Sequence, residues 1–573
     1  MSSPVAARHR LAVAVLTAVP AAAYITYGLV QYATFRVGTF DLVIFDQAVR
    51  SYAHLHLGVS PVKGVQDGFG PAFSVLGDHW SPVIALLAPL YWIYDGPQDL
   101  LVAQGVLFAL AVPPLWSFTR RVCAAPISGA PAAGAPAVSG SGAPAAPGSR
   151  GPAAPGSRGP AAAAYLVAAA YALSWPIAAA VATGFHEVAF VPVLTAVFFE
   201  RLAAGRIRTA VAAALALLLV KEDMGLLVAG FGLFLLAARG SRFSRWAPGH
   251  PLAGRHRVTL GAGLVAGGIA AMLLATYVLR PAFGGRAGYY WAYWSLGGNA
   301  RLAAEHALRD PVMAARLAIT PSVKLTTMMW LAGVLLFLPL LSPITLAALP
   351  LLAERMLASS QPNWWGTTFQ YNAFVEMVLV CAAADGAARI AGWAARSRGT
   401  AEDRGRPGRG GAGRWGAGRW GVIVTALVCA AAVAVLPRFA LASLATPGFY
   451  SRDRQMQAEA AADAVVPRGV TVDAAQMLGP QLSGRDTVLL WGPAATSAAW
   501  IVAQAHYTYP FRSLPGQRAQ IGDLERRGYQ VAFRRDGYLV LHRPPGHPGH
   551  KPGADASGPD ARALAWGAWR PLR

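Results

Sequence analysis

The chain has 573 residues, of which 55% are hydrophobic and only 13% are charged, and its mean hydropathy is +0.40. This composition excludes an ordinary soluble protein, because apolar runs of about twenty residues, long enough to cross a bilayer core of about 30 Å, recur along the sequence. The net charge of +22 does not indicate nucleic acid binding, because the arginines cluster in short links between apolar runs, as in the cytoplasmic loops of membrane proteins.

Cysteine and lysine are both scarce. The cysteines are Cys123, Cys381 and Cys429, and the lysines are Lys63, Lys221, Lys324 and Lys551. No two cysteines have CxxC spacing, so the sequence predicts neither a disulfide framework nor a zinc site.

The N-terminus predicts a membrane span that begins in the cytoplasm. Arg8 and Arg10 close a short segment, 1–10, and an apolar run follows over residues 11–32. A signal peptide is an alternative, since Ala21–Ala23 offers small residues for cleavage. The apolar run continues well past them, which favours an uncleaved span.

The stretch FDLVIFDQ, Phe40–Gln47, places two aspartates just after this span. A carboxylate at the mouth of a span is costly to desolvate and therefore usually has a purpose. Asp41 and Asp46 are five residues apart, which puts them on different faces of a helix. We interpret one as a chemical group and the other as a structural group; the alternative is that both merely end a helix at the interface.

The predicted outer loop, residues 33–81, is polar and rich in Gly and His, and its GDHWSP motif carries Asp78 and His79. The apolar piece Val83–Tyr94 is too short to cross and predicts a helix at the outer interface. A second span, about 100–118, stops at Arg120 and Arg121 on the inner side.

Residues 123–160 predict a disordered cytoplasmic insertion. They are rich in Ala, Pro, Gly and Ser and contain AAPGSRGP twice, at 145–152 and 153–160. Such a composition cannot bury a core.

The third and fourth spans, about 162–181 and 189–202, meet at an outer TGFHEV turn that carries His186 and Glu187. The next apolar run, 209–238, is interrupted by Lys221, Glu222 and Asp223 and has arginines at both ends. Each half has about twelve to fifteen residues, roughly 18–22 Å, which does not cross the core. The three charges are therefore predicted to be recessed in a water-filled cavity, or to pin helices together as a structural cluster.

The remaining spans are predicted at about 258–279, in a hairpin that starts at Lys324 and turns at Leu341–Pro343, at about 372–390, and at 421–438. Outer links include the aromatic run Gly288–Gly298, which is typical of the membrane interface or of a sugar-stacking surface. A basic, Gly-rich link, 396–420, is predicted in the cytoplasm. The total is about eleven crossings, with the N-terminus inside and the C-terminus outside.

The C-terminal part changes character. Residues 455–543 contain alternating apolar pieces (GVTVDAA, DTVLLWG, AAWIVAQ and YQVAFRRDGYLVLHR) that predict strands, with a short helix at Ile521–Gly528. The fold class predicted is therefore an α-helical polytopic membrane protein with a small extracytoplasmic α/β domain. Residues 544–573 predict a disordered tail.

Carboxylates collect on the predicted outer side, although the positive-inside rule makes no demand on acids. They are Asp41, Asp46, Asp78, Glu187, Glu222, Asp223 and Glu354. This bias predicts an outward cavity lined with carboxylates, some imidazoles and one lysine.

The motifs FDLVIFDQ, GDHWSPVIALLAPLYW, GFHEVAF, LLLVKEDMGLLVAGFGLFLL and FLPLLSPITLAALPLL occur in this order. Over residues 10–395 the chain resembles an uncharacterised bacterial family of predicted polytopic membrane proteins that is grouped with the GT-C glycosyltransferases. The C-terminal strands resemble the extracytoplasmic tail of such proteins. The resemblance implies a GT-C-like transmembrane domain over 11–395 and location in the bacterial plasma membrane, in contact with membrane lipids.

The resemblance also implies an activity, the transfer of a sugar from a polyprenyl-phosphate carrier to an acceptor on the outer side. It implies Asp41, with Asp46 second, as the general base or the group that positions the acceptor. It implies Lys221 as the group that binds the donor phosphate, with Arg280 and Lys324 next. The segment TTFQYNAF contains Gln370 and Tyr371, where Gln370 stands in place of the basic residue that is common before the tyrosine.

Asp78, His79, His186 and Glu187 are possible ligands of a divalent metal, because carboxylate and imidazole suit several ions. Two other function classes stay open. The chain is a transporter or flippase if its broken helices line a substrate pathway, or a non-catalytic envelope scaffold if its outer domain only binds partners.

Overall fold

A computed structural model describes residues 4–124, 158–238, 252, 254–402, 412–493, 498–505, 510–511 and 513–544. Residues 125–157 of the predicted insertion, 403–411 of the predicted basic link and 545–573 of the predicted tail lie outside the described residues.

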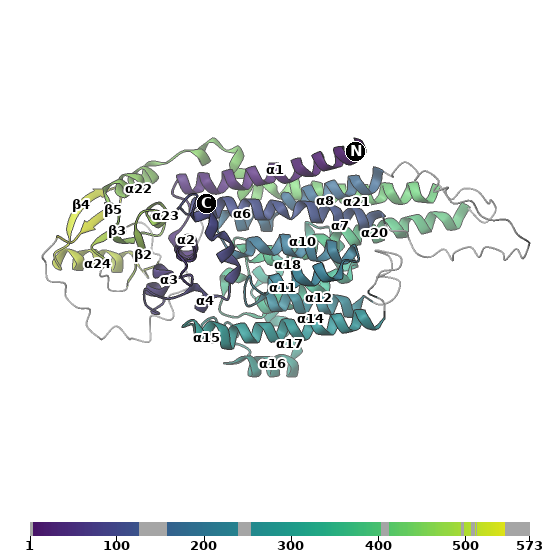
Figure 1. Ribbon diagram of the computed structural model, residues 1–573, viewed down its shortest axis with the longest axis horizontal. Coiled ribbons are helices and arrows are strands. Elements are labelled where there is room, and N and C mark those ends of the chain that lie inside the picture. The colour runs from purple at the N-terminus through teal and green to yellow at the C-terminus, as the bar shows by residue number, and fades with distance from the viewer. Residues whose placement is uncertain are drawn as a thin grey trace, which may run out of the picture.

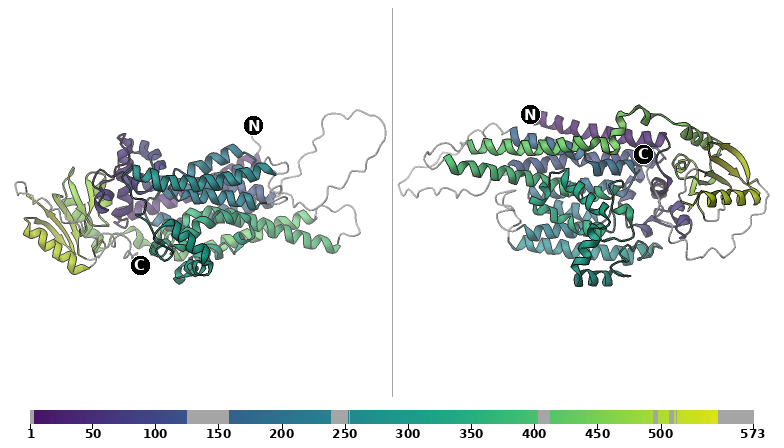
Figure 2. Two further views of the ribbon diagram at one scale, coloured as in Figure 1. Left: turned by 90° about the horizontal axis from the view of Figure 1, so that it is seen from below. Right: turned by 180° about the vertical axis from the view of Figure 1, so that it is seen from behind.

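The molecule is an elongated helix bundle with a small α/β domain at one end (Figure 1). We name the bundle end that carries this domain the domain end, and the opposite end the far end. The two further views show the same arrangement (Figure 2). The predicted fold class is confirmed in its helical bundle and its C-terminal sheet domain.

Helices of the predicted spans form the bundle. They are α1 (Pro4–Ala33), α6 (Gln98–Leu110), α7 (Val112–Ala124), α8 (Arg158–Ala172), α9 (Trp175–Ala182), α10 (Phe190–Ala203), α11 (Ile207–Leu217), α12 (Met224–Ala237), α14 (Arg255–Leu274), α18 (Ser322–Gly333), α19 (Leu349–Leu357), α20 (Ala373–Glu402) and α21 (Ala412–Val435). Among the described residues, five segments are long and apolar enough to cross a membrane: Ala7–Ala33, Gln98–Ala124, Gly159–Ala182, Arg255–Ala282 and Arg419–Arg438. The total of about eleven crossings stays a prediction.

Helix α12 packs directly against α14 through glycines. A Cβ at Gly225 of α12 would overlap the carbonyl oxygen of Gly268 in α14, and one at Gly232 would overlap that of Gly261. In a membrane the hydrophobic effect does not drive helices together. Small residues there let helix backbones approach closely. This contact holds the short α12 beside a helix that is long enough to cross.

The predicted outer loop is itself folded. It contains α2 (Thr39–Ala53), α3 (Pro61–Gln66) and α4 (Val75–Asp78), and the segment predicted at the interface forms η1 (Pro82–Leu87) and α5 (Ala88–Tyr91). Helix α2 is buried along much of its length, from Thr39 to Val49. The backbone N–H of Val83 bonds to Leu219 O at 3.0 Å, so η1 also lies against the end of α11.

Shorter elements connect the helices. They are η2 (Glu187–Ala189), η3 (Ala275–Leu279), α15 (Arg280–Ala282), α16 (Ala300–Arg309), α17 (Pro311–Ile319), η4 (Leu338–Leu341), η5 (Pro343–Ala347), η6 (Pro362–Trp364), η7 (Gln370–Asn372), η8 (Leu436–Arg438), η9 (Ala440–Ala445) and η10 (Pro447–Tyr450).

The C-terminal domain contains one five-stranded sheet in the order β2-β1-β3-β5-β4. Its elements are α22 (Arg454–Val465), β1 (Thr471–Ala474), α23 (Gly479–Ser483), β2 (Thr487–Leu490), β3 (Trp500–Gln504), α24 (Leu514–Arg526), β4 (Gln530–Arg535) and β5 (Tyr538–His542). Strand β1 pairs in parallel with β2 and β3, whereas β5 is antiparallel to β3 and β4. The strands predicted from alternation are confirmed. Asp536 and Gly537, both with positive φ, make the hairpin turn that such a pair favours.

Candidate functional site

Asp41 lies in the first turn of α2, after Gly38 in extended backbone. Its Oδ2 is 3.3 Å from His186 Nε2; the Asp41 side chain is 45% exposed and that of His186 only 5%. A carboxylate is favoured near a helix N-terminus by the backbone dipoles. Asp41 is therefore a partly solvated acid held against a buried imidazole.

The chain continues from His186 to Glu187, and this neighbour reaches the recessed lysine. Lys221 Nζ is 3.4 Å from Glu187 Oε1. His186 has extended backbone at the start of η2, so the two successive side chains point to different neighbours. One turn thus links Asp41 of α2 to Lys221, which lies in the break between α11 and α12.

Glu222, the next residue in that break, joins three further parts of the chain. His79 Nδ1 lies 2.8 Å from its Oε1, the Trp80 N–H donates to its Oε2 at 3.0 Å, and Arg280 Nη1 is 3.5 Å from Oε1. These contacts connect the break to the end of α4 and to α15.

Electrostatic interactions tie these groups into one set. Lys221 interacts with Glu187, Glu222, Asp223 and Tyr371, and Tyr371 in turn interacts with Asp41. We name the set the Asp41–Glu222 cluster; it consists of Asp41, His79, His186, Glu187, Lys221, Glu222, Asp223 and Arg280. Pairwise contacts thus connect Asp41, Lys221 and Glu222, and the outward cavity expected from the sequence stays a prediction.

Several buried polar atoms of this cluster have no hydrogen-bond partner within the described part of the chain. They are Nδ1 and Nε2 of His186, Glu187 Oε2, Asp223 Oδ1, and Nε and Nη2 of Arg280. Buried polar atoms in native proteins are nearly always bonded, to protein or to water. A concentration of such atoms in one place indicates a region built to receive polar groups.

Asp78 belongs to a different group, the Lys63 cluster, which consists of Lys63, Asp67, Asp78 and Tyr290. Lys63 Nζ is 2.7 Å from Asp67 Oδ2 and 3.1 Å from Asp78 Oδ1, and it donates to the Tyr290 hydroxyl at 3.0 Å. The Tyr290 hydroxyl donates to Asp78 Oδ1. Burial disfavours the charged form of Asp78, but Lys63, His79 and Tyr290 outweigh it, so the pKa of Asp78 lies below its ordinary value.

Tyr290 connects the two clusters. Its ring stacks on His79 with centroids 4.7 Å apart, and the Arg280 guanidinium lies 5.5 Å from the same ring. The aromatic run predicted for the interface therefore also contacts residues of the Asp41–Glu222 cluster. Sequence reasoning missed Lys63 and Tyr290; the rarity of lysine was the available signal for Lys63.

Asp46 faces away from this region, as the spacing of five residues predicted. It is fully buried, with Arg50 at 2.8 Å and the Tyr91 hydroxyl at 2.8 Å. Burial raises the pKa of Asp46, and Arg50, Tyr91 and Ser483 offset this only in part. Its surroundings are those of a structural group.

Lys324 binds backbone carbonyls, and so does Arg355, a cation that sequence reasoning missed, whose partners include Tyr371, the residue after Gln370. The Lys324 ammonium donates to Leu317 O at 2.7 Å and to Ala358 O at 2.8 Å. Arg355 donates to the carbonyls of Trp364 and Tyr371, at 2.7 and 2.9 Å. Both cations therefore bind backbone carbonyl groups of neighbouring loops and helix ends. An arginine on the acid-rich side departs from the positive-inside pattern, and that departure was the available signal for Arg355.

The possible metal ligands do not form one ligand set. Asp78 is bound to Lys63, His79 to Glu222, and His186 to Asp41. Over the described ranges, no group of three or more His, Cys, Asp or Glu side chains is placed to hold a metal ion.

The chain is similar to a known protein family and to solved structures. No curated protein matches this chain. The crystal structure of ArnT from Cupriavidus metallidurans bound to undecaprenyl phosphate is similar at 12% sequence identity, with a TM-score of 0.43, over 94% of this chain and 99% of that chain. A family model described as "Predicted membrane protein (DUF2079)" matches residues 31–540. The chain therefore belongs to this family of predicted membrane proteins, as its motifs indicated.

Proposed function

We propose that the chain is a membrane glycosyltransferase that moves a sugar from a polyprenyl-phosphate donor to an acceptor hydroxyl at the domain end, on the outer face of the membrane. The observation that carries the proposal is the placing of a partly exposed aspartate, Asp41, beside the recessed cation Lys221 through His186 and Glu187. The motif resemblance to GT-C glycosyltransferases supports the same reaction.

In the proposed reaction Asp41 acts on the acceptor, and Lys221 and Arg280 act on the phosphate of the donor. The Asp41 carboxylate takes the proton of the acceptor hydroxyl, and the acceptor oxygen attacks the anomeric carbon of the sugar. The bond from that carbon to the phosphate oxygen breaks, and polyprenyl phosphate leaves with both bonding electrons. Lys221 and Arg280 supply positive charge for the leaving phosphate.

The exposure of Asp41 suits the role of base. A general base must come within hydrogen-bond reach of the acceptor hydroxyl, and an acceptor can reach an exposed carboxylate from solvent but not an enclosed one. Asp46 does not have this property, because it is fully buried between Arg50 and Tyr91. Of the two aspartates in α2, we therefore assign the base to Asp41.

The test is lipid and glycan profiling of a strain that lacks the gene, complemented with variants. The Asp41→Asn variant should restore at least about 100-fold less product than the native protein, because general-base catalysis contributes about 10²–10⁴-fold. Lys221→Ala should reduce it similarly. The matched control is Asp310→Asn, since Asp310 caps the exposed helix α17 and asparagine caps equally well.

Protein amount in the membrane must be equal in all strains. Full restoration of the product by both Asp41→Asn and Lys221→Ala would exclude the proposed catalytic site.

A further inference from the structure

Helix α2 is held from its other side by the C-terminal domain, which is far away in the sequence. At its first residue, the Thr39 hydroxyl donates to Gln476 O at 2.7 Å, and the Thr39 N–H bonds to the same carbonyl. Thr39 is fully buried. The first turn of α2 carries Asp41, two residues after Thr39. This turn is therefore anchored to the carbonyl of Gln476, which lies between β1 and α23.

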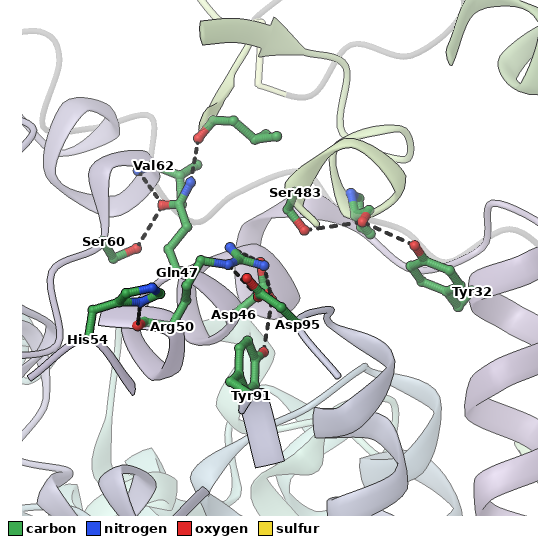
Figure 3. A network of polar contacts seen from close by, with 12 residues as sticks. Tyr32, Asp46, Gln47, Arg50, His54, Ser60, Val62, Tyr91, Asp95 and Ser483 are labelled. Atoms are coloured by element: carbon green, nitrogen blue, oxygen red, sulfur yellow. Dashed lines mark hydrogen bonds and ion pairs between the residues drawn. The ribbon is translucent and has the colours of Figure 1, made fainter. Parts of the chain in front are cut away.

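A second attachment lies two turns further along α2. Gln47 Nε2 donates to Val488 O of β2 at 2.7 Å, and Gln47 Oε1 accepts from the Val62 N–H at 2.9 Å and from the Ser60 hydroxyl at 3.3 Å. Figure 3 shows Gln47 reaching toward Ser60 and Val62, next to the network of Asp46, Arg50 and Tyr91. The amide of Gln47 thus joins α2, α3 and the C-terminal sheet.

Packing at the first attachment leaves no free space. A Cβ added to Gly479, the first residue of α23, would overlap the Thr39 side chain. In the reverse direction, the Gln481 side chain of α23 donates to Tyr32 O at 2.5 Å, at the end of α1. The domain therefore contacts α2 and the preceding span over a continuous surface.

The Asp41 side chain contributes little to its own placement. Its ion-pair partner in the described structure is His186, at 3.3 Å, and nearly half of the side chain is exposed. The position of its carboxylate thus follows the backbone of α2, and this backbone is held at Thr39 and Gln47. An error of about 1 Å in a reacting group costs about 10²-fold in rate.

We propose that Thr39 is a positioning residue, through which the C-terminal domain sets the place of Asp41 against His186. The inference rests on the proposed function of Asp41. Loss of the hydrogen bond from the Thr39 hydroxyl to Gln476 O would loosen the turn that carries Asp41. The α/β domain therefore takes part in the reaction by positioning the base.

The first test compares two substitutions at Thr39 in the full-length protein. Thr39→Val keeps the shape and loses the hydroxyl, whereas Thr39→Ser keeps the hydroxyl. We expect Thr39→Val to lower the product restored in the deletion strain about ten- to 100-fold, and Thr39→Ser to restore it. Gly479→Ala should give the same loss from the domain side.

The matched control is Thr425→Val. Thr425 is buried and donates to Gly421 O at 2.8 Å within α21, so this variant loses an equivalent bond away from α2. Membrane amount and melting temperature of the Thr39 and Thr425 variants should agree, while only Thr39→Val loses product.

Two readouts separate positioning from general stability. Hydrogen exchange over residues 39–47 of the purified full-length protein should be faster in Thr39→Val than in Thr425→Val. In an Asp41→Glu background, which moves the carboxylate by one methylene, Thr39→Val should cause a much smaller further loss, because residues that act as a unit are not additive.

The outcomes distinguish the two proposals. If Asp41→Asn abolishes the product while Thr39→Val leaves it normal, the positioning inference is wrong and the proposed function stands. Unchanged exchange over 39–47, or equal fold losses from Thr39→Val in the native and the Asp41→Glu backgrounds, also overturns the inference. Normal product with Asp41→Asn shows that Asp41 is not the base and overturns the inference. Normal product with both Asp41→Asn and Lys221→Ala overturns the proposed function as well.

Discussion

Asp41 and Asp46 show how identical side chains on one helix acquire different properties. Asp41 contacts a buried imidazole and solvent, whereas Asp46 is enclosed by Arg50 and Tyr91. Helical spacing was sufficient to predict that they face different ways. Which of them is exposed depends on where the C-terminal domain and the segment at Tyr91 pack, and the sequence around the aspartates carries no signal for that.

A titration prediction belongs to Glu459 of α22, in the C-terminal domain. Burial raises the pKa of Glu459 from 4.5 to about 8, although the Tyr538 hydroxyl donates to it. The folded state therefore binds a proton more tightly than the unfolded state. The resulting stability is fully present below pH 4.5 and is lost as the pH rises through the folded pKa.

Thermal unfolding of the full-length protein between about pH 6 and pH 9 should show this loss as a falling melting temperature. Glu459→Gln removes the titrating group and should flatten the dependence. The control is Glu525→Gln, at a half-exposed glutamate of α24. An unchanged pH dependence in Glu459→Gln would contradict the prediction.

At the scale of elements, the break between α11 and α12 does most to create the site. Two short apolar helices flank Lys221, Glu222 and Asp223, and their length alone predicted that the charges are recessed. The close glycine packing of α12 on α14 then brings the break near Arg280, which lies in α15 after η3. Element length was readable in the sequence, but the choice of neighbouring helix was not.

The aromatic segment around Tyr290 gives a second test at this scale. Tyr290→Phe removes the hydroxyl that bonds to Asp78 and Lys63 but keeps the ring that stacks on His79. We expect a loss of about 1 kcal/mol in unfolding free energy, the net value of a typical hydrogen bond. Tyr290→Ala also loses the stack and should cost more.

The measurement is the melting temperature of the two variants, together with protease sensitivity of the segment near residues 283–299. Equal stability of the Phe and Ala variants would show that the ring does not support the site. Tyr450→Phe, at an exposed tyrosine whose hydroxyl donates to Leu444 O at 2.8 Å, serves as the control for the loss of a hydroxyl.

At the scale of the whole molecule, the arginine distribution predicts that the domain end faces outward and the far end faces the cytoplasm. In a variant with the three native cysteines replaced by alanine, Ser451→Cys should react with a membrane-impermeant maleimide in intact cells. Ser451 is exposed just before α22, at the domain end. Arg208→Cys, at the far end in α11, should react only after permeabilisation.

This pair of sites carries its own control, because Ser451→Cys should react in both intact and permeabilised cells and Arg208→Cys only in permeabilised cells. The reverse pattern would place the α/β domain in the cytoplasm and contradict the orientation on which the outer-face reaction depends.

Sequence patterns alone determined the class of this protein and most of its elements. Apolar runs long enough for a bilayer predicted the helices, and alternation predicted the strands, because both signals lie within about twenty neighbouring residues. Tertiary structure alone decided the partners of the charges and of the buried hydroxyl: Glu222 pairs with His79, 143 positions away, and Thr39 pairs with Gln476. Attraction between two groups depends on their separation in space, and packing of distant segments sets that separation only when the chain folds.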